Sequence, residues 1–382
     1  MGEEANIFGN KKEAREQTRS NAMKIAEQKT IETFRQFVNT GQLPSYTDNE
    51  GKWIHGDRSN QKNWWTAGFL PASLWELSDI KNGNPQNKSN SSLIADSYVR
   101  ENPLKNLQSH DIGFIAYGIL VEGYKRTNNK KYKKMALDAA RQLAQRSTKK
   151  SKIIRSWGNE NSVIIDSLMN LKLLYWAAQN GGDPELTAIA NNHADFVLNN
   201  HMRTDGSTYH RVYFDPLTED PTEKGTVQGF EKESTWSRGQ AWAINGFTEV
   251  FELSNNPKYL ETAKKAADFF ISHLPMDNIP YWDFHFADDN IPPAPKDSSA
   301  AAIAADGLIR LSKHLKSPDG DIYREKAELI LDTLCSPEYL DIEKQSQAVL
   351  KHGTGHYHKG IIDRGLIYGD YYFIKALKEL MH

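Results

Sequence analysis

Two aspartates are the first candidates for acid–base chemistry. Asp111 and Asp166 each begin a helix-length run of small and apolar residues. Carboxyl groups transfer protons in catalysis when their surroundings raise the pKa. Aspartate is also a favoured N-cap, which makes helix capping an equal alternative for both residues. For Asp297, which heads the triplet Asp-Ser-Ser, we favour capping.

Aromatic, cationic and amide residues stand near the same helix starts. Indole rings present flat faces for stacking on a sugar ring, and arginine and amide groups bind hydroxyls or carboxylates. A cation is disfavoured at a helix N-terminus, so Arg238 suggests an anionic ligand or a neighbouring carboxylate. This combination is typical of a carbohydrate site, and its candidate members are Trp65, His110, Asp111, Trp157, Asp166, Gln228, Trp236, Arg238, Trp242, Asp297 and Tyr357.

A weak internal repeat predicts the elements that position these residues. Helix-length apolar runs begin near Trp65, Asp111, Asp166, Arg238, Asp297 and Arg364, and a more polar, amphipathic helix follows most of them. We expect an all-α fold with a single domain over residues 1–382. Six helical hairpins would close into an (α/α)6 barrel, which buries every inner helix. An open helical solenoid is the rival, but its repeats normally keep a tighter period of about 34 to 47 residues.

Composition limits the class of partner. The 382 residues carry 47 Lys+Arg against 49 Asp+Glu, a net charge of −2 that argues against nucleic acid and membrane surfaces. No apolar run is long enough to span a bilayer, and the start lacks the basic and apolar regions of a signal peptide. The one cysteine, Cys335, allows no intrachain disulfide and is expected to be a buried structural thiol. We therefore expect a cytoplasmic protein.

Three histidines lie close together in the glycine-rich segment 351–359, at His352, His356 and His358. They are candidates for metal ligands, but no nearby carboxylate completes a set, and a sugar-contacting loop is the preferred interpretation. The chain contains neither a glycine-rich phosphate-binding motif nor a Gly-x-Ser-x-Gly elbow. These absences argue against the common nucleotide enzymes and serine hydrolases.

A series of motifs in a fixed order resembles the unsaturated glucuronyl hydrolases of glycoside hydrolase family 88. The resemblance runs from about Trp65 to the C-terminus. The motifs include His-Asp-Ile-Gly-Phe at 110–114, Ile-Ile-Asp-Ser-Leu-Met-Asn at 164–170, Gly-Thr-Val-Gln-Gly at 225–229 and Ser-Thr-Trp-Ser-Arg-Gly-Gln-Ala-Trp at 234–242.

The resemblance implies an enzyme that removes the non-reducing Δ4,5-unsaturated glucuronic acid from disaccharides made by glycosaminoglycan lyases, derived from chondroitin, hyaluronan or heparin. Such enzymes hydrate the C4=C5 vinyl ether and need no metal or organic cofactor. By this resemblance Asp166 is the general acid and base and Asp111 its carboxylate partner. The residues expected to contact substrate are Trp65, Trp157, His210, Gln228, Trp236, Arg238, Trp242, Tyr357 and His358.

Two details of the resemblance concern proton affinity and sulfate. An isolated aspartate titrates near 3.9, so burial and the charge of Asp111 are expected to raise the pKa of Asp166 in a paired titration. In the loop 353–362, Thr354, His358 and Lys359 are candidates for contacting a sulfate.

Two other functions remain open at this point. The related unsaturated rhamnogalacturonyl hydrolases use the same barrel on pectin fragments, and a non-catalytic helical scaffold would bind proteins instead. The linkage cleaved, the sulfation preferred and the oligomeric state are not specified by these motifs.

Overall fold

The inner ring of the molecule is built from helices whose starts converge at one end. The computed structural model describes residues 2–55, 61–81, 83–286 and 294–381. Most residues of the inner helices α9 (Ser237–Ser254) and α11 (Ser298–Ser312) are buried, because small and apolar side chains surround each helix on all sides. The inner segments are α2 (Phe69–Ser78), α4 (Ile112–Ala116) continuing through the π-helical turn η3 (Tyr117–Val121) into α5 (Glu122–Thr127), α7 (Leu171–Gln179) after the 3₁₀ turn η4 (Ile165–Asn170), α9 (Ser237–Ser254), α11 (Ser298–Ser312) and α13 (Ile367–Met381).

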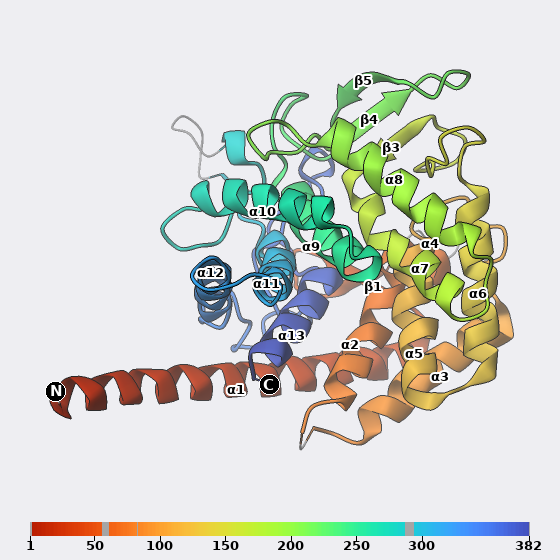
Figure 1. Ribbon diagram of the computed structural model, residues 1–382. Coiled ribbons are helices and arrows are strands. Elements are labelled where there is room, and N and C mark those ends of the chain that lie inside the picture. The colour runs from red at the N-terminus through yellow and green to blue at the C-terminus, as the bar shows by residue number, and fades with distance from the viewer. Residues whose placement is uncertain (1, 56–60, 82, 287–293, 382) are drawn as a thin grey trace.

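The outer helices alternate with the inner ones along the chain and cover them from outside (Figure 1). They are α1 (Gly2–Thr40), α3 (Gln86–Glu101), α6 (Lys130–Gln145), α8 (Glu185–His201), α10 (Pro257–Ser272) and α12 (Asp319–Leu334). The last inner helix, α13, packs against the first, α2, so the ring closes. This arrangement confirms the predicted (α/α)6 barrel and excludes an open solenoid.

Asparagine residues set many helix boundaries. The side chains of Asn129 and Asn256 accept hydrogen bonds from backbone N–H groups in the first turns of α6 and α10. Asn102, Asn128 and Asn255 end α3, α5 and α9 in the left-handed conformation, with φ of 47°, 55° and 56°. The turns between paired helices are therefore encoded locally.

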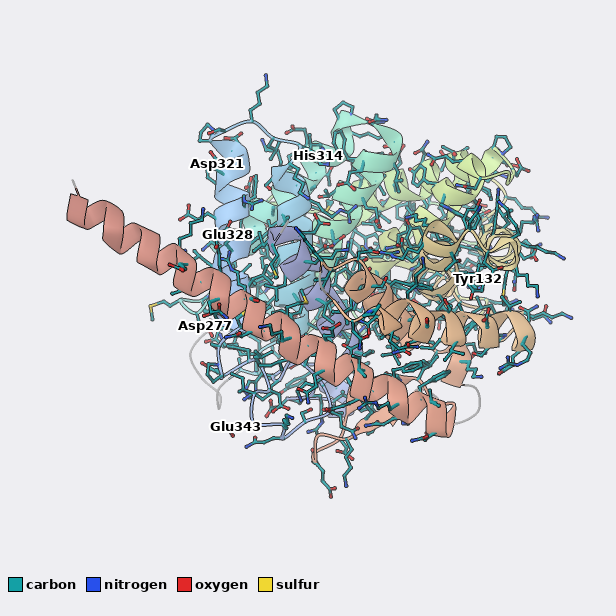
Figure 2. The ribbon with its side chains drawn as sticks, turned by 90° about the horizontal axis from the view of Figure 1, so that it is seen from below. Tyr132, Asp277, His314, Asp321, Glu328 and Glu343 are labelled. Carbon is teal, nitrogen blue, oxygen red and sulfur yellow. The ribbon has the colours of Figure 1, made fainter. Side chains whose placement is uncertain are left out.

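Helix α1 lies across one face of the barrel, and its N-terminal end extends beyond the body (Figures 1 and 2). Arg19 pairs with Asp332 at 2.8 Å and with Glu328 of α12 at 3.4 Å. Lys29 is buried and pairs with Asp341 at 2.5 Å. These contacts attach α1 to the C-terminal third of the chain, and Figure 2 shows Glu328 beside it.

Two small antiparallel sheets supplement the helices. Strands β1 (Pro44–Thr47) and β2 (Trp53–His55) form one, and β3 (Ser162–Ile164), β4 (Arg211–Phe214) and β5 (Pro221–Gly225) form the other. Strands β4 and β5 of the second sheet lie in the segment between α8 and α9. The remaining 3₁₀ turns are η1 (Gln61–Asn63), η2 (Trp65–Gly68), η5 (Phe284–Phe286) and η6 (Tyr357–Lys359). No helix in the described part of the chain has a stretch long and apolar enough to cross a membrane.

Candidate active site

A cavity of about 330 Å³ opens at the end of the barrel where the inner helices begin. Residues from segments far apart in the chain line it, and both candidate aspartates are among them. The lining consists of Ser45, Tyr46, Trp64, Trp65, Asp111, Phe114, Trp157, Ile164, Asp166, Val227, Gln228, Arg238, Gly355, His356, Lys359, Ile361, Leu366 and Tyr368.

The Asp111 side chain faces the cavity and does not cap a helix. The residue occupies the N-cap position of α4, yet its carboxylate makes no capping hydrogen bond. Its Oδ2 accepts from the Ser109 hydroxyl at 2.8 Å, and its Oδ1 lies 3.3 Å from Nε2 of His110. The Nδ1–H of His110 donates to the carbonyl of Ser156 at 3.0 Å, which orients the ring toward Asp111. The carboxylate is therefore held in place while one edge remains open to the cavity.

Asp166 combines burial with an unpartnered oxygen. It lies in the first turn of η4, and its Oδ1 is buried without a hydrogen-bond partner among the described residues. Burial raises the pKa of the Asp166 carboxyl to about 6 and is the largest influence on it. His110 and Arg238 lower this pKa, while the charge of Asp111 makes a smaller upward contribution. The expected pKa increase is present, with burial contributing more than the second carboxylate.

His210 presents an N–H group toward Asp166. Its Nδ1 accepts from the backbone N–H groups of Val227 and Gln228, at 3.1 and 3.3 Å. Burial lowers the pKa of His210 well below its usual range, so the ring is neutral and its single proton resides on Nε2. That nitrogen lies 3.8 Å from Asp166 Oδ1, which is too far for a direct hydrogen bond. The ring also packs against Trp236 in a tilted arrangement, with ring centroids 4.4 Å apart.

Gly113 allows the two aspartate-bearing segments to approach each other. A Cβ atom at this position would lie 2.5 Å from Cα and Cβ of Asn170. Asn170 also accepts the Phe114 backbone N–H through its Oδ1 at 2.7 Å, which joins the start of α4 to the end of η4. Asp111 and Asp166 therefore reach one cavity partly because residue 113 has no side chain.

We expect Gly113→Ala to lower kcat/KM by at least about tenfold and to destabilise the fold by about 1–3 kcal/mol, because the added methyl group forces α4 and η4 apart. Steady-state kinetics and urea unfolding measure the two effects. Gly158→Ala is a control from the same region that meets no neighbour within 4 Å, although its positive φ of 49° adds local strain. Unchanged kinetics in Gly113→Ala would show that this close approach does not position the aspartates.

Arg238 is paired inside the protein. Its Nη1 donates to Asp297 Oδ2 at 2.5 Å and to the Thr354 carbonyl, and its Nη2 donates to Gln228 Oε1 and the Gly355 carbonyl. Asp297 also caps α11 by accepting from the backbone of Ser299 and Ala300. The expected neighbouring carboxylate is thus Asp297, and the predicted cap is observed as well. Arg238 joins α9, α11 and the loop 353–362 beneath the cavity.

The remaining predicted contacts divide into two groups. Trp65 and Trp157 line the cavity together with Gln228, and Lys359 lies exposed at its mouth. His210, Trp236, Trp242, Tyr357 and His358 do not belong to the lining. Trp242 is 1% exposed, packed between Phe114 and Tyr372.

The three histidines of the loop 351–359 have different surroundings, although the ring centroids of His356 and His358 lie only 6.2 Å apart. His352 pairs with Asp363, and Tyr357 stacks on Trp282 with ring centroids 4.0 Å apart. His358 donates from Nε2 to the Gly229 carbonyl. The Thr354 hydroxyl donates to the Lys296 carbonyl and is fully buried, so it is not available to a sulfate.

Several lining residues were not expected from the sequence. Ser45, Tyr46 and Trp64 come from the N-terminal segment, and Tyr368 comes from the C-terminal one. His356, which also lines the cavity, belongs to the loop that was expected to contact sugar. Burial lowers the pKa of His356 to about 4, so its ring is neutral near pH 7. The one sequence signal for Trp64 was its position next to Trp65, which was already a candidate for contacting the sugar.

Comparison with known proteins agrees with this geometry. Residues 46–380 match the profile of Glycosyl Hydrolase Family 88. The chain belongs to glycoside hydrolase family 88. It is 37% identical over 325 residues to an unsaturated glucuronyl hydrolase of Formosa agariphila, covering 82% of this chain and 79% of that one.

Solved structures of family 88 hydrolases have the same fold. The unsaturated glucuronyl hydrolase of Bacillus sp. GL1, described as responsible for the degradation of glycosaminoglycan, superposes with a TM-score of 0.88 at 32% identity, covering 95% of this chain and 96% of that one. An aspartate-to-asparagine variant of the Streptococcus agalactiae enzyme, complexed with dGlcA-GalNAc6S, has a TM-score of 0.81 at 28% identity and covers 95% and 91% of the two chains.

The raised pKa of Asp166 predicts a pH dependence of turnover. An acid with a pKa of about 6 loses its proton above that pH, so we expect kcat/KM to fall about tenfold per pH unit in the alkaline range. Initial rates between pH 4.5 and 8.5 give the profile. A profile that stays level from pH 5 to 8 would contradict Asp166 as the proton donor.

Proposed function

We propose that this enzyme removes Δ4,5-unsaturated glucuronic acid from the non-reducing end of disaccharides produced by glycosaminoglycan lyases. The observation that carries the proposal is the buried, protonatable carboxyl of Asp166 beside Asp111 in an indole-walled cavity. The names of the relatives support the same substrate class. The chain thus supplies a buried proton donor and a cavity in which a sugar ring can lie against it.

The proposed reaction begins with a proton transfer to carbon. Asp166 gives its proton to C4 of the vinyl ether, which leaves positive charge shared between C5 and the ring oxygen. Water then forms a bond to C5 and returns a proton to the Asp166 carboxylate. The resulting hemiketal opens by breaking the bond from C5 to the ring oxygen, and the hemiacetal left at C1 releases the second sugar, with one water consumed overall.

Asp111 and its neighbours have supporting roles in this proposal. The Asp111 carboxylate stabilises the positive charge that develops on the sugar and helps to keep the proton on Asp166 before reaction. Trp65, Trp157 and Gln228 contact the unsaturated sugar. Arg238 lines the cavity and holds Gln228 in place, while His210, Trp236 and Trp242 support the cavity from behind. Tyr357 and His358 shape the loop at its rim.

The test is the loss of the vinyl-ether absorbance near 235 nm. We expect the wild-type chain to consume an unsaturated chondroitin disaccharide and to leave a lyase-made unsaturated rhamnogalacturonan disaccharide largely untouched. Preference for the pectin product would establish the alternative activity, while no loss of absorbance with either would favour a non-catalytic scaffold. A panel of unsulfated and sulfated disaccharides then resolves linkage and sulfate preference.

We also propose that the chain is one catalytic domain in the cytoplasm. One continuous apolar core that includes residues from Ala22 to Leu377 supports the single domain. The single cysteine, Cys335, is buried and suits a reducing compartment. Limited proteolysis and cell fractionation test the two statements.

A further inference from the structure

Trp64 differs from the other tryptophans in its exposure. Its side chain is 38% exposed, whereas Trp236 and Trp242 are 2% and 1% exposed. Trp64 still belongs to the cavity lining, next to Tyr46 of β1. A single exposed aromatic residue is ordinary on a protein surface, but at the edge of a binding cavity it offers a flat apolar face that a sugar ring can cover.

The Trp64 ring is held at its edge. Its Nε1 donates to the Ser45 hydroxyl at 3.3 Å, and Ser45 is itself buried in β1. The backbone of Trp64 is extended, with φ of −69° and ψ of 143°, immediately before the turn η2. Among the described residues, Trp64 makes no ring-to-ring contact, although its neighbour Trp65 packs against Phe69, Phe114 and Tyr368. Because Trp64 is 38% exposed, part of its ring is accessible to a ligand.

The two adjacent indoles serve different depths of the cavity. Trp65 contacts Phe114, which lies in the first turn of α4 next to Asp111. Trp65 therefore lies in the part of the cavity that contains the carboxylates. Trp64 belongs with the outer part, as does Lys359, which is exposed. A disaccharide whose unsaturated ring lies against the carboxylates must place its second sugar toward this outer part.

We propose that Trp64 is the stacking platform for the second sugar, the one released by the reaction. The C–H face of that pyranose covers the exposed indole, and Ser45 keeps the ring at the required angle. This inference rests on the proposed function, because it assigns a subsite for the same disaccharide. It makes Trp64 a determinant of which aglycone is accepted and not a participant in proton transfer.

The test compares two substrates in Trp64→Ala. We expect KM for the unsaturated chondroitin disaccharide to rise about tenfold with kcat within about twofold of wild type. For the methyl glycoside of the unsaturated uronic acid, which lacks the second sugar, both constants are expected to remain at wild-type values. Trp64→Phe retains a flat ring and is expected to restore most of the affinity.

Controls separate stacking from folding and from the proposed reaction. Tyr213→Ala removes an equally exposed aromatic ring of β4 outside the cavity and is expected to leave both substrates unaffected. Thermal unfolding verifies that Trp64→Ala is folded. Calorimetric titration of Asp166→Asn, with and without Trp64→Ala, measures disaccharide binding in the absence of turnover.

The outcomes are distinct. A Trp64→Ala variant that changes KM equally for both substrates, or for neither, overturns the platform while leaving the proposed reaction intact. A wild-type chain that does not consume the disaccharide overturns the proposed function. In that case equal binding of the disaccharide with and without Trp64 also overturns the platform.

Discussion

We expect replacement of Asp166 with asparagine to lower kcat on unsaturated chondroitin disaccharide about 1000-fold, while the disaccharide still binds. The amide keeps the shape of the side chain but cannot deliver a proton to C4 or accept one from water. Loss of absorbance near 235 nm gives the rate, and calorimetry gives the affinity. This variant has the largest expected effect on turnover because it removes the only buried carboxyl in the cavity lining whose pKa is raised toward neutrality.

Although Asp166→Asn is expected to lower turnover, it is expected to raise the free energy of unfolding at high pH. This increase provides an internal control that the variant is folded. A pKa raised from 3.8 to about 6 means that the native state retains its proton to a higher pH than the unfolded chain. Stability is therefore lost as pH rises through this window, by about 3 kcal/mol in total. We expect Asp166→Asn to be more resistant to unfolding than wild type at pH 8 and little changed at pH 4.

Asp111→Asn is the matched comparison for the catalytic assignment. We expect it to reduce kcat as well, because the carboxylate that stabilises developing charge is lost, and its pH profile should shift. If Asp166→Asn kept near-normal turnover while Asp111→Asn lost it, the two roles would be reversed.

Removing the Arg238 guanidinium is expected to produce the largest loss of stability. Arg238→Met leaves Asp297 buried without its cationic partner, which costs about 3–5 kcal/mol. It also removes the donor of the hydrogen bonds to the Thr354 and Gly355 carbonyls and to Gln228 Oε1. Denaturant unfolding measures the first effect, and a fall in kcat/KM reports the second.

A double-mutant cycle separates charge from packing. Asp297→Asn retains the capping oxygen for α11 while removing the unpaired charge, so the double variant Arg238→Met/Asp297→Asn should be more stable than Arg238→Met alone. Additive losses in the cycle would show that the 2.5 Å pair contributes no coupling energy.

Local sequence signals predicted the helices well, but they did not distinguish the roles of aspartates at equivalent helix starts. Asp111 and Asp297 each stand at a helix start with the same capping preference. Asp297 caps its helix and binds Arg238, whereas Asp111 is held by Ser109 and faces the cavity. The preference of an aspartate for capping depends on its neighbours in the sequence. Whether its carboxylate caps the helix or faces a cavity depends on the side chains that surround it in the folded chain.

The tryptophans show the same division. Trp65, Trp236 and Trp242 all lie near inner helix starts, yet Trp65 lines the cavity and Trp242 lies in the core. Trp64, which has the most exposed ring of the cavity's tryptophans, was not singled out at all. A period of 3.6 residues tells which side chains share a helix face, but it does not tell how deep each lies once helices from different hairpins meet.

Periodicity and capping residues were sufficient for the helical hairpins, because these properties depend on residues close together in the chain. The closed ring was expected from the internal repeat, and the pair of aspartates at its open end from the resemblance of the ordered motifs. Three properties could be determined only from the folded molecule. They are the raised pKa of Asp166, the pairing of Arg238 with buried groups, and the exposure of Trp64 compared with the burial of Trp242. Each depends on burial and on distances between atoms that hundreds of residues can separate, and neither quantity exists until the barrel has closed.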